Sequence, residues 1–170
     1  MPSFESAFAE LFDAHFRRLF RYLDRLSGDP DLAADLAQEA FIRLHRRGGL
    51  PDVPQAWLVT VALNLFRNAR TSRARRAVLL GGSRGESTRP DPEPAPDARL
   101  LAEDERHRVR TVLDRLPERE RQLLLLRAED YSYRDLAVAL KLHEASVGVL
   151  LARARRAFRV AWEEGNDASR

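Results

Sequence analysis

The stretch Ser132–Phe158, SYRDLAVALKLHEASVGVLLARARRAF, decides the fold that we expect for the C-terminal part of the chain. Ser132, with Asp135 three residues later, is typical of a capping box at the start of a short helix. Lys141–Glu144 predicts a tight turn, and a longer helix with a regular apolar stripe follows from Ala145. This order predicts a helix-turn-helix, although helical bundles use the same turn.

The first 80 residues predict three further helices. Apolar side chains recur at three- and four-residue steps from Phe4 to Leu26, which indicates a long helix with one buried face. Asp29 can cap a second helix with Pro30 at its first position. A third apolar stripe begins at Trp57, a position that favours core packing over stacking on a base. No strictly alternating pattern competes, so we expect an all-α protein.

Residues 81–98, GGSRGESTRPDPEPAPDA, separate the two helical parts. This segment has three glycines, four prolines and no large apolar side chain, so it cannot bury enough surface to fold. Such a linker would reach about 25 Å as a flexible coil and nearly 55 Å when extended. We therefore expect two small helical domains, at residues 1–80 and 99–170, joined by a flexible linker.

The composition excludes several classes of protein. The 170 residues include no cysteine, which excludes disulfides, cysteine-ligated zinc and thiolate nucleophiles. Nowhere do eighteen apolar residues run together, and the N-terminus lacks the basic and apolar regions of a signal peptide. We expect a cytoplasmic protein with no stable membrane insertion.

Positive charge is concentrated in two places. Residues 41–80 carry eight basic side chains and one acidic one, and Phe66–Arg76 contains five arginines and no acid. This is more charge than a helix end needs for its dipole, although a solvated helix end is the simpler alternative. Residues 145–162 contain four arginines and again no acid. Both stretches favour contact with nucleic acid phosphates.

No arrangement of side chains indicates an enzyme, a metal site or a cofactor. The four histidines lie far apart in the sequence, and neither a glycine-rich phosphate loop nor a GxSxG turn occurs. Asp31, Asp35 and Glu39 share one side of the second helix, where an acidic ridge that faces a partner is more plausible than a metal site.

Several motifs taken together resemble a bacterial sigma factor of the extracytoplasmic-function (ECF) subfamily. Asp35–Leu44, DLAQEAFIRL, resembles the DLxQExFxRL signature of sigma region 2, and Ala56–Leu58 with Ala62–Asn64 resembles the segment after it. In the second part, three segments resemble region 4: Leu113–Arg121, Tyr131–Ala137 and Arg153–Arg155. The motifs occur in the family's order, with no domain between them.

The resemblance implies roles for region 2. One face would dock on the clamp helices of the RNA polymerase largest subunit, through Asp35, Gln38, Glu39, Ile42 and Arg43. The loop at residues 46–54, where paired glycines allow close approach of the backbone, would hold a flipped base of the minus-ten promoter element. The residues expected to contact this element are Arg46, Arg47, Asn64, Arg67, Asn68 and Arg70.

Region 4 would read the minus-thirty-five element with the second helix of the helix-turn-helix. The expected residues are Ser146, Gly148, Val149, Arg153 and Arg156. Gly148 and Val149 offer close approach or methyl contact with thymine, where family members often have polar or basic residues. The two arginines would anchor the DNA backbone.

The expected function is therefore promoter recognition and DNA opening together with core RNA polymerase. The expected partners are core RNA polymerase, promoter DNA and an anti-sigma factor. A stand-alone helix-turn-helix regulator is the alternative, but it leaves the acidic ridge and the first domain unexplained. A protein-interaction module without a DNA role is a third class.

Overall fold

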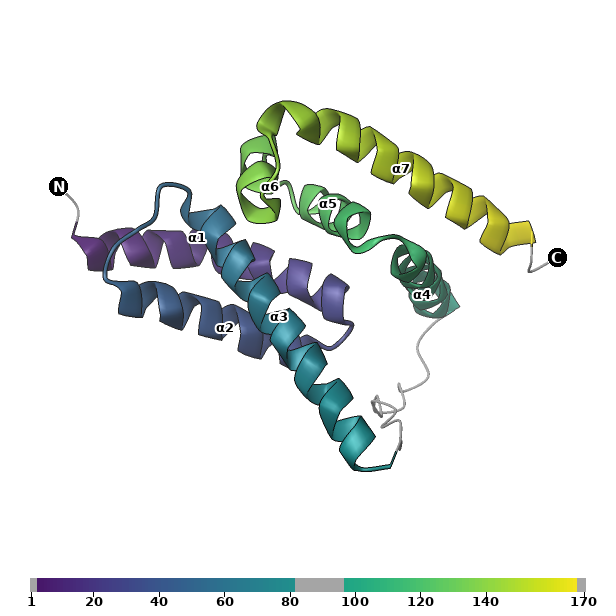
Figure 1. Cartoon of the computed structure of the whole chain (residues 1–170), viewed down its shortest axis with the longest axis horizontal. Coiled ribbons are helices and arrows are strands. Elements are labelled where there is room, and N and C mark those ends of the chain that lie inside the picture. The colour runs from purple at the N-terminus through teal and green to yellow at the C-terminus, as the bar shows by residue number, and fades with distance from the viewer. Residues whose placement is uncertain (1–2, 82–96, 168–170) are drawn as a thin grey trace.

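The computed structural model describes residues 3–81 and 97–167, and in these ranges the chain is helical with no strand. Figure 1 shows the arrangement of its helices. They are α1 (Phe4–Ser27), α2 (Pro30–Arg47), α3 (Pro54–Leu79), α4 (Asp97–Arg115), α5 (Glu118–Ala128), α6 (Tyr133–Leu140) and α7 (Glu144–Asp167). The all-α prediction is confirmed. Most of the predicted linker lies outside the described residues, and its last two residues belong to α4.

The boundary between α1 and α2 follows the predicted capping signals. Gly28 ends α1 in the left-handed region, with φ of 70° and its N–H donated to the carbonyl of Asp24. Asp29 then caps α2, because its carboxylate accepts a hydrogen bond of 3.1 Å from the N–H of Leu32. Pro30 stands at the start of α2, where its missing N–H costs nothing.

Helices α1–α3 form an N-terminal unit with an aromatic and aliphatic core. Tyr22 and Leu23 on α1 are fully buried, as are Ala33, Ala40 and Leu44 on α2. Burial on α3 extends beyond the predicted stripe, since the buried residues of this helix are Ala56, Leu58, Val59, Ala62, Leu63 and Phe66. They cover about 160° of the helix circumference, more than the apolar stripe of about 100° that one-sided packing needs.

Helices α4–α7 form a C-terminal unit. The capping box is confirmed, because Ser132 accepts from the N–H of Asp135 and Asp135 accepts from the N–H of Ser132. Lys141 then turns the chain in the left-handed region, with φ of 55°. The long helix α7 begins one residue before its predicted start and continues beyond Trp162 to Asp167. It packs against α4, α5 and α6.

The two units pack against each other. Helix α6 lies against α3, and α5 lies against α1, as Figure 1 shows near its centre. One cluster of buried apolar side chains therefore includes Leu23 and Leu63 of the N-terminal unit together with Leu126 and Leu136 of the C-terminal unit. This packing against α6 accounts for the additional buried face of α3.

We expect the substitution Asp29→Ala to lower the free energy of unfolding by about 1 kcal/mol, because it removes the N-cap of α2. Chemical denaturation at neutral pH measures this difference. Asp13→Ala, at an exposed position on α1, is the matched control. Equal stability of Asp29→Ala and the wild-type chain would show that the cap contributes nothing.

The contribution of Asp29 should also depend on pH. The hydrogen bond from Leu32, followed by that from Arg73, lowers the pKa of Asp29 from its ordinary value. The carboxylate therefore stabilises the fold fully above its unfolded-state pKa, and this stabilisation is lost as the pH falls through the folded-state pKa. The difference between Asp29→Ala and the wild-type chain should shrink in acid.

Candidate functional site

The exposed face of α3 carries the predicted basic surface. The whole stretch Phe66–Arg76 is helical, and its arginines are largely accessible. Four of the residues predicted to contact DNA lie on this helix, namely Asn64, Arg67, Asn68 and Arg70. Arg67 also binds Glu118 at the start of α5, with Nε 2.9 Å from Oε1. The surface is thus accessible, and one of its cations is paired with the C-terminal unit.

The other two predicted DNA contacts, Arg46 and Arg47, do not lie in a loop. Both belong to the last turn of α2, which ends only at Gly48, where φ is 73°. Glycine adopts the left-handed backbone conformation at little steric cost. The helix therefore continues until Gly48, the first residue that can end it in this conformation. The loop before α3 is therefore Gly48–Val53, and the two arginines extend an exposed basic helix end beside it.

The outer face of α2 carries the predicted polymerase-binding residues. Asp35, Gln38, Ile42 and Arg43 are exposed there. Glu39 is half-buried and forms an ion pair with Arg43 one helical turn later, at 3.0 Å. Ile42 is an apolar side chain with 43% of its surface exposed on this otherwise polar face. A single exposed apolar side chain is common on protein surfaces, so Ile42 is informative only together with the aromatic side chains that line a pocket with it.

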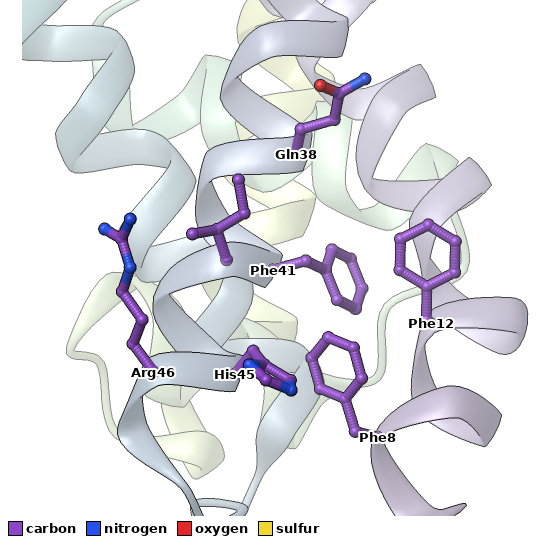
Figure 2. A pocket seen from close by; sticks show the side chains of 7 residues that line it. Phe8, Phe12, Gln38, Phe41, His45 and Arg46 are labelled. Carbon is purple, nitrogen blue, oxygen red and sulfur yellow. The ribbon is translucent and has the colours of Figure 1, made fainter. Parts of the chain in front are cut away.

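Beside this face lies a pocket that the sequence did not predict. Its volume is about 400 Å³, and Figure 2 shows Phe8 and Phe12 of α1 projecting toward Phe41 and His45 of α2. The full lining is Phe8, Phe12, Gln38, Phe41, Ile42, His45 and Arg46. Phe8 and Phe12 belong to the apolar stripe from Phe4 to Leu26, and no feature of that stripe distinguishes core residues from residues that line a pocket.

The start of α7 presents the predicted reading surface of the helix-turn-helix. Ser146, Val149, Arg153 and Arg156 lie on this helix, and 72% of the surface of Val149 is accessible. Gly148 is half-buried beside the ring of Tyr133 on α6. A side chain at this position would point at that ring. Because glycine has no side chain, the α7 backbone beside Tyr133 is left uncovered.

A polar cluster lies between α1 and the residues around the start of α6. Burial lowers the pKa of His15, as does the nearby Arg18, while Asp135 opposes the shift. Arg18 also lies over the ring of Tyr131, 4.1 Å from its centroid, and burial raises the pKa of Tyr131 to about 12. Tyr131 is therefore neutral at physiological pH. This cluster belongs to the contact between the units and carries no predicted site residue.

Neither a metal site nor a membrane span occurs in the described parts of the chain. Among residues 3–81 and 97–167, no group of three or more histidine, aspartate or glutamate side chains could hold a metal ion. None of the helices in these ranges is long and apolar enough to cross a bilayer.

Family comparisons account for both units. The model for Sigma-70 region 2 matches residues 11–76, and the model for Sigma-70 region 4 matches residues 106–158. The chain is 33% identical over 140 residues to the ECF RNA polymerase sigma factor EcfG of Rhodopseudomonas palustris, a match that spans 78% of this chain and 70% of EcfG. This chain belongs to the ECF sigma factor family.

Two further comparisons agree with this assignment. The ECF sigma factor SigL of Mycobacterium tuberculosis is 31% identical over 159 residues, which span 91% of this chain and 88% of SigL. A solved structure of the sigma factor RpoE of Bartonella quintana, in complex with the anti-sigma factor NepR, has a TM-score of 0.66. It is 20% identical in sequence and covers 92% of this ECF sigma factor and 97% of RpoE, so it supports the fold.

The geometry at Gly148 predicts opposite effects of one substitution on stability and on DNA binding. A methyl group there would lie 3.6 Å from Tyr133, an ordinary contact, so Gly148→Ala should stabilise α7 by about 0.5–1 kcal/mol. The same methyl group would cover α7 backbone next to the partly exposed ring of Tyr133, and this narrows the space that we predict for close approach to a base. Promoter affinity should therefore fall by about fivefold or more, which is about 1 kcal/mol.

Thermal unfolding and promoter binding by the reconstituted holoenzyme measure these two effects. Gly165→Ala, near the end of α7 and outside the predicted reading surface, is the control, because its added methyl group would make an ordinary contact with the side chain of Arg115, 4.0 Å away. Promoter affinity that Gly148→Ala leaves unchanged would remove Gly148 from the reading surface.

Proposed function

We propose that this ECF sigma factor binds core RNA polymerase and directs it to promoter DNA, where the holoenzyme opens the minus-ten element. The observation that carries this proposal is the match of regions 2 and 4 in order along one chain, at residues 11–76 and 106–158. Both regions fold as helical units, and each presents exposed basic residues. We propose that the chain recognises DNA and makes or breaks no covalent bond. The binding energy within the holoenzyme drives the opening of the strands.

Core polymerase is proposed to bind the outer face of α2. Asp35, Gln38, Ile42 and Arg43 are exposed there, next to the aromatic pocket that Phe8 and Phe12 help to line. A surface that combines an apolar centre with a polar rim suits a stable protein partner. The residues proposed to contact DNA on α3 and α7 lie outside this face, and Asn64, Arg67 and Ser146 among them are exposed.

The minus-ten element is proposed to bind along α3 and the end of α2. The arginines supply positive charge for phosphates, and the amides of Asn64 and Asn68 can hydrogen-bond to base edges. A Cβ atom added at Gly48 or Gly49 would meet no other atom within 4 Å, so this turn is open to an approaching base. The arginines in question are Arg46, Arg47, Arg67 and Arg70.

The minus-thirty-five element is proposed to bind α7. The second helix of a helix-turn-helix normally enters the major groove with its first residues at the base edges. Ser146, Gly148 and Val149 occupy these positions, and the exposed Arg153 and Arg156 follow later on the same helix. We expect base reading from the first three and backbone anchoring from the arginines.

An anti-sigma factor is a further proposed partner. The support is the solved relative of similar fold, RpoE, which was determined in complex with the anti-sigma factor NepR. We place the protein in the cytoplasm, where RNA polymerase acts. A stand-alone helix-turn-helix regulator does not account for region 2, which covers most of α1–α3.

The double substitution Gln38→Ala with Glu39→Arg should abolish co-purification with core polymerase. It removes an exposed amide and replaces the partner of Arg43 with a second cation on the proposed docking face. Glu103→Arg on α4 is exposed and makes the same change of charge, so it serves as the control. Undiminished binding by a double variant with wild-type helix content would refute the assignment of this face.

A further inference from the structure

The last turns of α3 carry exposed residues beyond those assigned to the minus-ten surface. Figure 1 shows this end of the helix, in teal, projecting past α1 and α2. Every residue from Thr71 to Arg76 is exposed. The contacts proposed above for this helix end at Arg70, so more than one turn of exposed helix has no assigned role.

Thr71 and Arg75 lie on the same face of α3 as Asn64 and Asn68. The four residues follow one another at steps of four, three and four positions, and all four are exposed. At about 100° per residue, these steps keep them within about 60° of the helix circumference. The face that is proposed to read the minus-ten element therefore continues without a break to Arg75, about 16 Å from Asn64 along the helix axis.

Arg75 is unpaired, unlike two of its neighbours on α3. The guanidinium of Arg67 pairs with Glu118 at 2.9 Å, and that of Arg73 pairs with Asp29 at 3.2 Å. Within residues 3–81 and 97–167, no carboxylate forms an ion pair with Arg75. A phosphate can therefore bind Arg75 without displacing a partner inside the protein.

Arg75 also has the best position among the arginines near the end of α3. Arg70 and Arg76 lie about 120° from Asn64 around the helix, on opposite sides of the shared face. The guanidinium of Arg70 lies over the ring of Phe66, 5.8 Å from its centroid. Arg75 lies about 20° from Asn64, so it points in nearly the same direction as the two asparagines.

Thr71 can offer a methyl group to a base. Its hydroxyl donates to the carbonyl of Arg67, one helical turn earlier, at 3.0 Å. Threonine has a single donor, so this hydrogen bond leaves its side chain with no donor for a base edge. The methyl group of threonine can contact the methyl group of thymine in the major groove. Thr71 is therefore suited to recognise thymine.

This face continues away from the turn that is proposed to receive a flipped base. That turn, at Gly48–Val53, precedes α3, and Asn64 and Asn68 lie farther along the helix. Residues beyond Asn68 lie farther still from the opened bases, on the side of the minus-thirty-five element, where the DNA stays double-stranded. The step from Asn68 to Arg75 is about 10 Å, which corresponds to about three base pairs of duplex.

We propose that Thr71 and Arg75 extend the DNA-binding face of α3 onto the duplex just upstream of the minus-ten element. Thr71 recognises a thymine there through contact between the two methyl groups, and Arg75 binds a phosphate of the DNA backbone. This inference rests on the promoter-binding function proposed above. It adds a short sequence preference outside the two named elements.

A promoter selection tests the contact of Thr71. Core polymerase with the wild-type chain first selects a promoter from a random library, and the five base pairs upstream of its minus-ten element are then randomised. The wild-type chain should enrich thymine at one position of this flank. Thr71→Ser keeps the hydroxyl and removes the methyl group, so it should lose this preference. Deoxyuridine in place of that thymine should lower wild-type affinity by about threefold, as expected for one methyl group.

The two changes should not add, because each removes one side of the same contact. Thr71→Ser should bind thymine and deoxyuridine templates equally well. Thr111→Ser on α4 is the matched control, since the exposed Thr111 also donates to a carbonyl four residues earlier, that of His107, at 3.0 Å. This control should show the full wild-type response. If Thr71→Ser responds to deoxyuridine as strongly as the wild-type chain does, the thymine contact is wrong.

The phosphate contact of Arg75 has a separate signature in salt. Arg75→Ala should weaken promoter binding by the holoenzyme and reduce the slope of log affinity against log salt concentration by about one. A neutral methylphosphonate at the contacted position of the flank should weaken wild-type binding but not binding by Arg75→Ala. Arg106→Ala, at an exposed position on α4, is the control and should keep the wild-type slope. An unchanged slope for Arg75→Ala would overturn the phosphate contact.

The outcomes separate this inference from the proposed function. If the holoenzyme with the wild-type chain selects no promoter, the proposed function fails and the inference fails with it. If promoters are selected but Thr71→Ser and Arg75→Ala both bind them as the wild-type chain does, only the inference is overturned. Circular dichroism checks that each variant keeps its helix content, so that a loss of binding reports a lost DNA contact.

Discussion

Helix α3 buries side chains over a wide arc, because it packs against α1 and α2 on one side and α6 on the other. If α6 were absent, part of this apolar surface would face water. The same helix carries Asn64 and Arg67 on its exposed face, so one element both holds the two units together and presents the basic surface. This packing sets how the α3 surface and the α7 surface lie relative to each other.

Local signals were sufficient to predict most of the helices and the capped starts of α2 and α6. Asp29 with Pro30 and Ser132 with Asp135 specify caps through hydrogen bonds that span three residues, and the structure contains both. The exposure of Arg67 on the outer face of α3 also followed from helical spacing. These features depend on neighbours in the sequence, so a periodic pattern is enough to predict them.

The features that sequence did not predict depend on contacts between distant residues. The wide buried arc of α3 depends on α6 as well as on α1 and α2, and the pocket beside Phe12 requires the pairing of α1 with α2. The ion pairs of Glu129 connect residues more than one hundred positions apart, which no periodicity can reveal. The placement of Arg46 within α2 was not predicted, because the sequence allows this helix to end either at Gly48 or at an earlier residue.

Purified core polymerase should gain promoter specificity from this chain. Run-off transcription on a promoter library, with and without the chain, measures this most directly. We expect discrete transcripts that depend on the chain and whose templates share two short elements. The names minus-ten and minus-thirty-five place these elements about 25 base pairs apart, which is about 85 Å of duplex. Two results would contradict this expectation: the same transcripts with core polymerase alone, or no transcript when the chain is added to core polymerase.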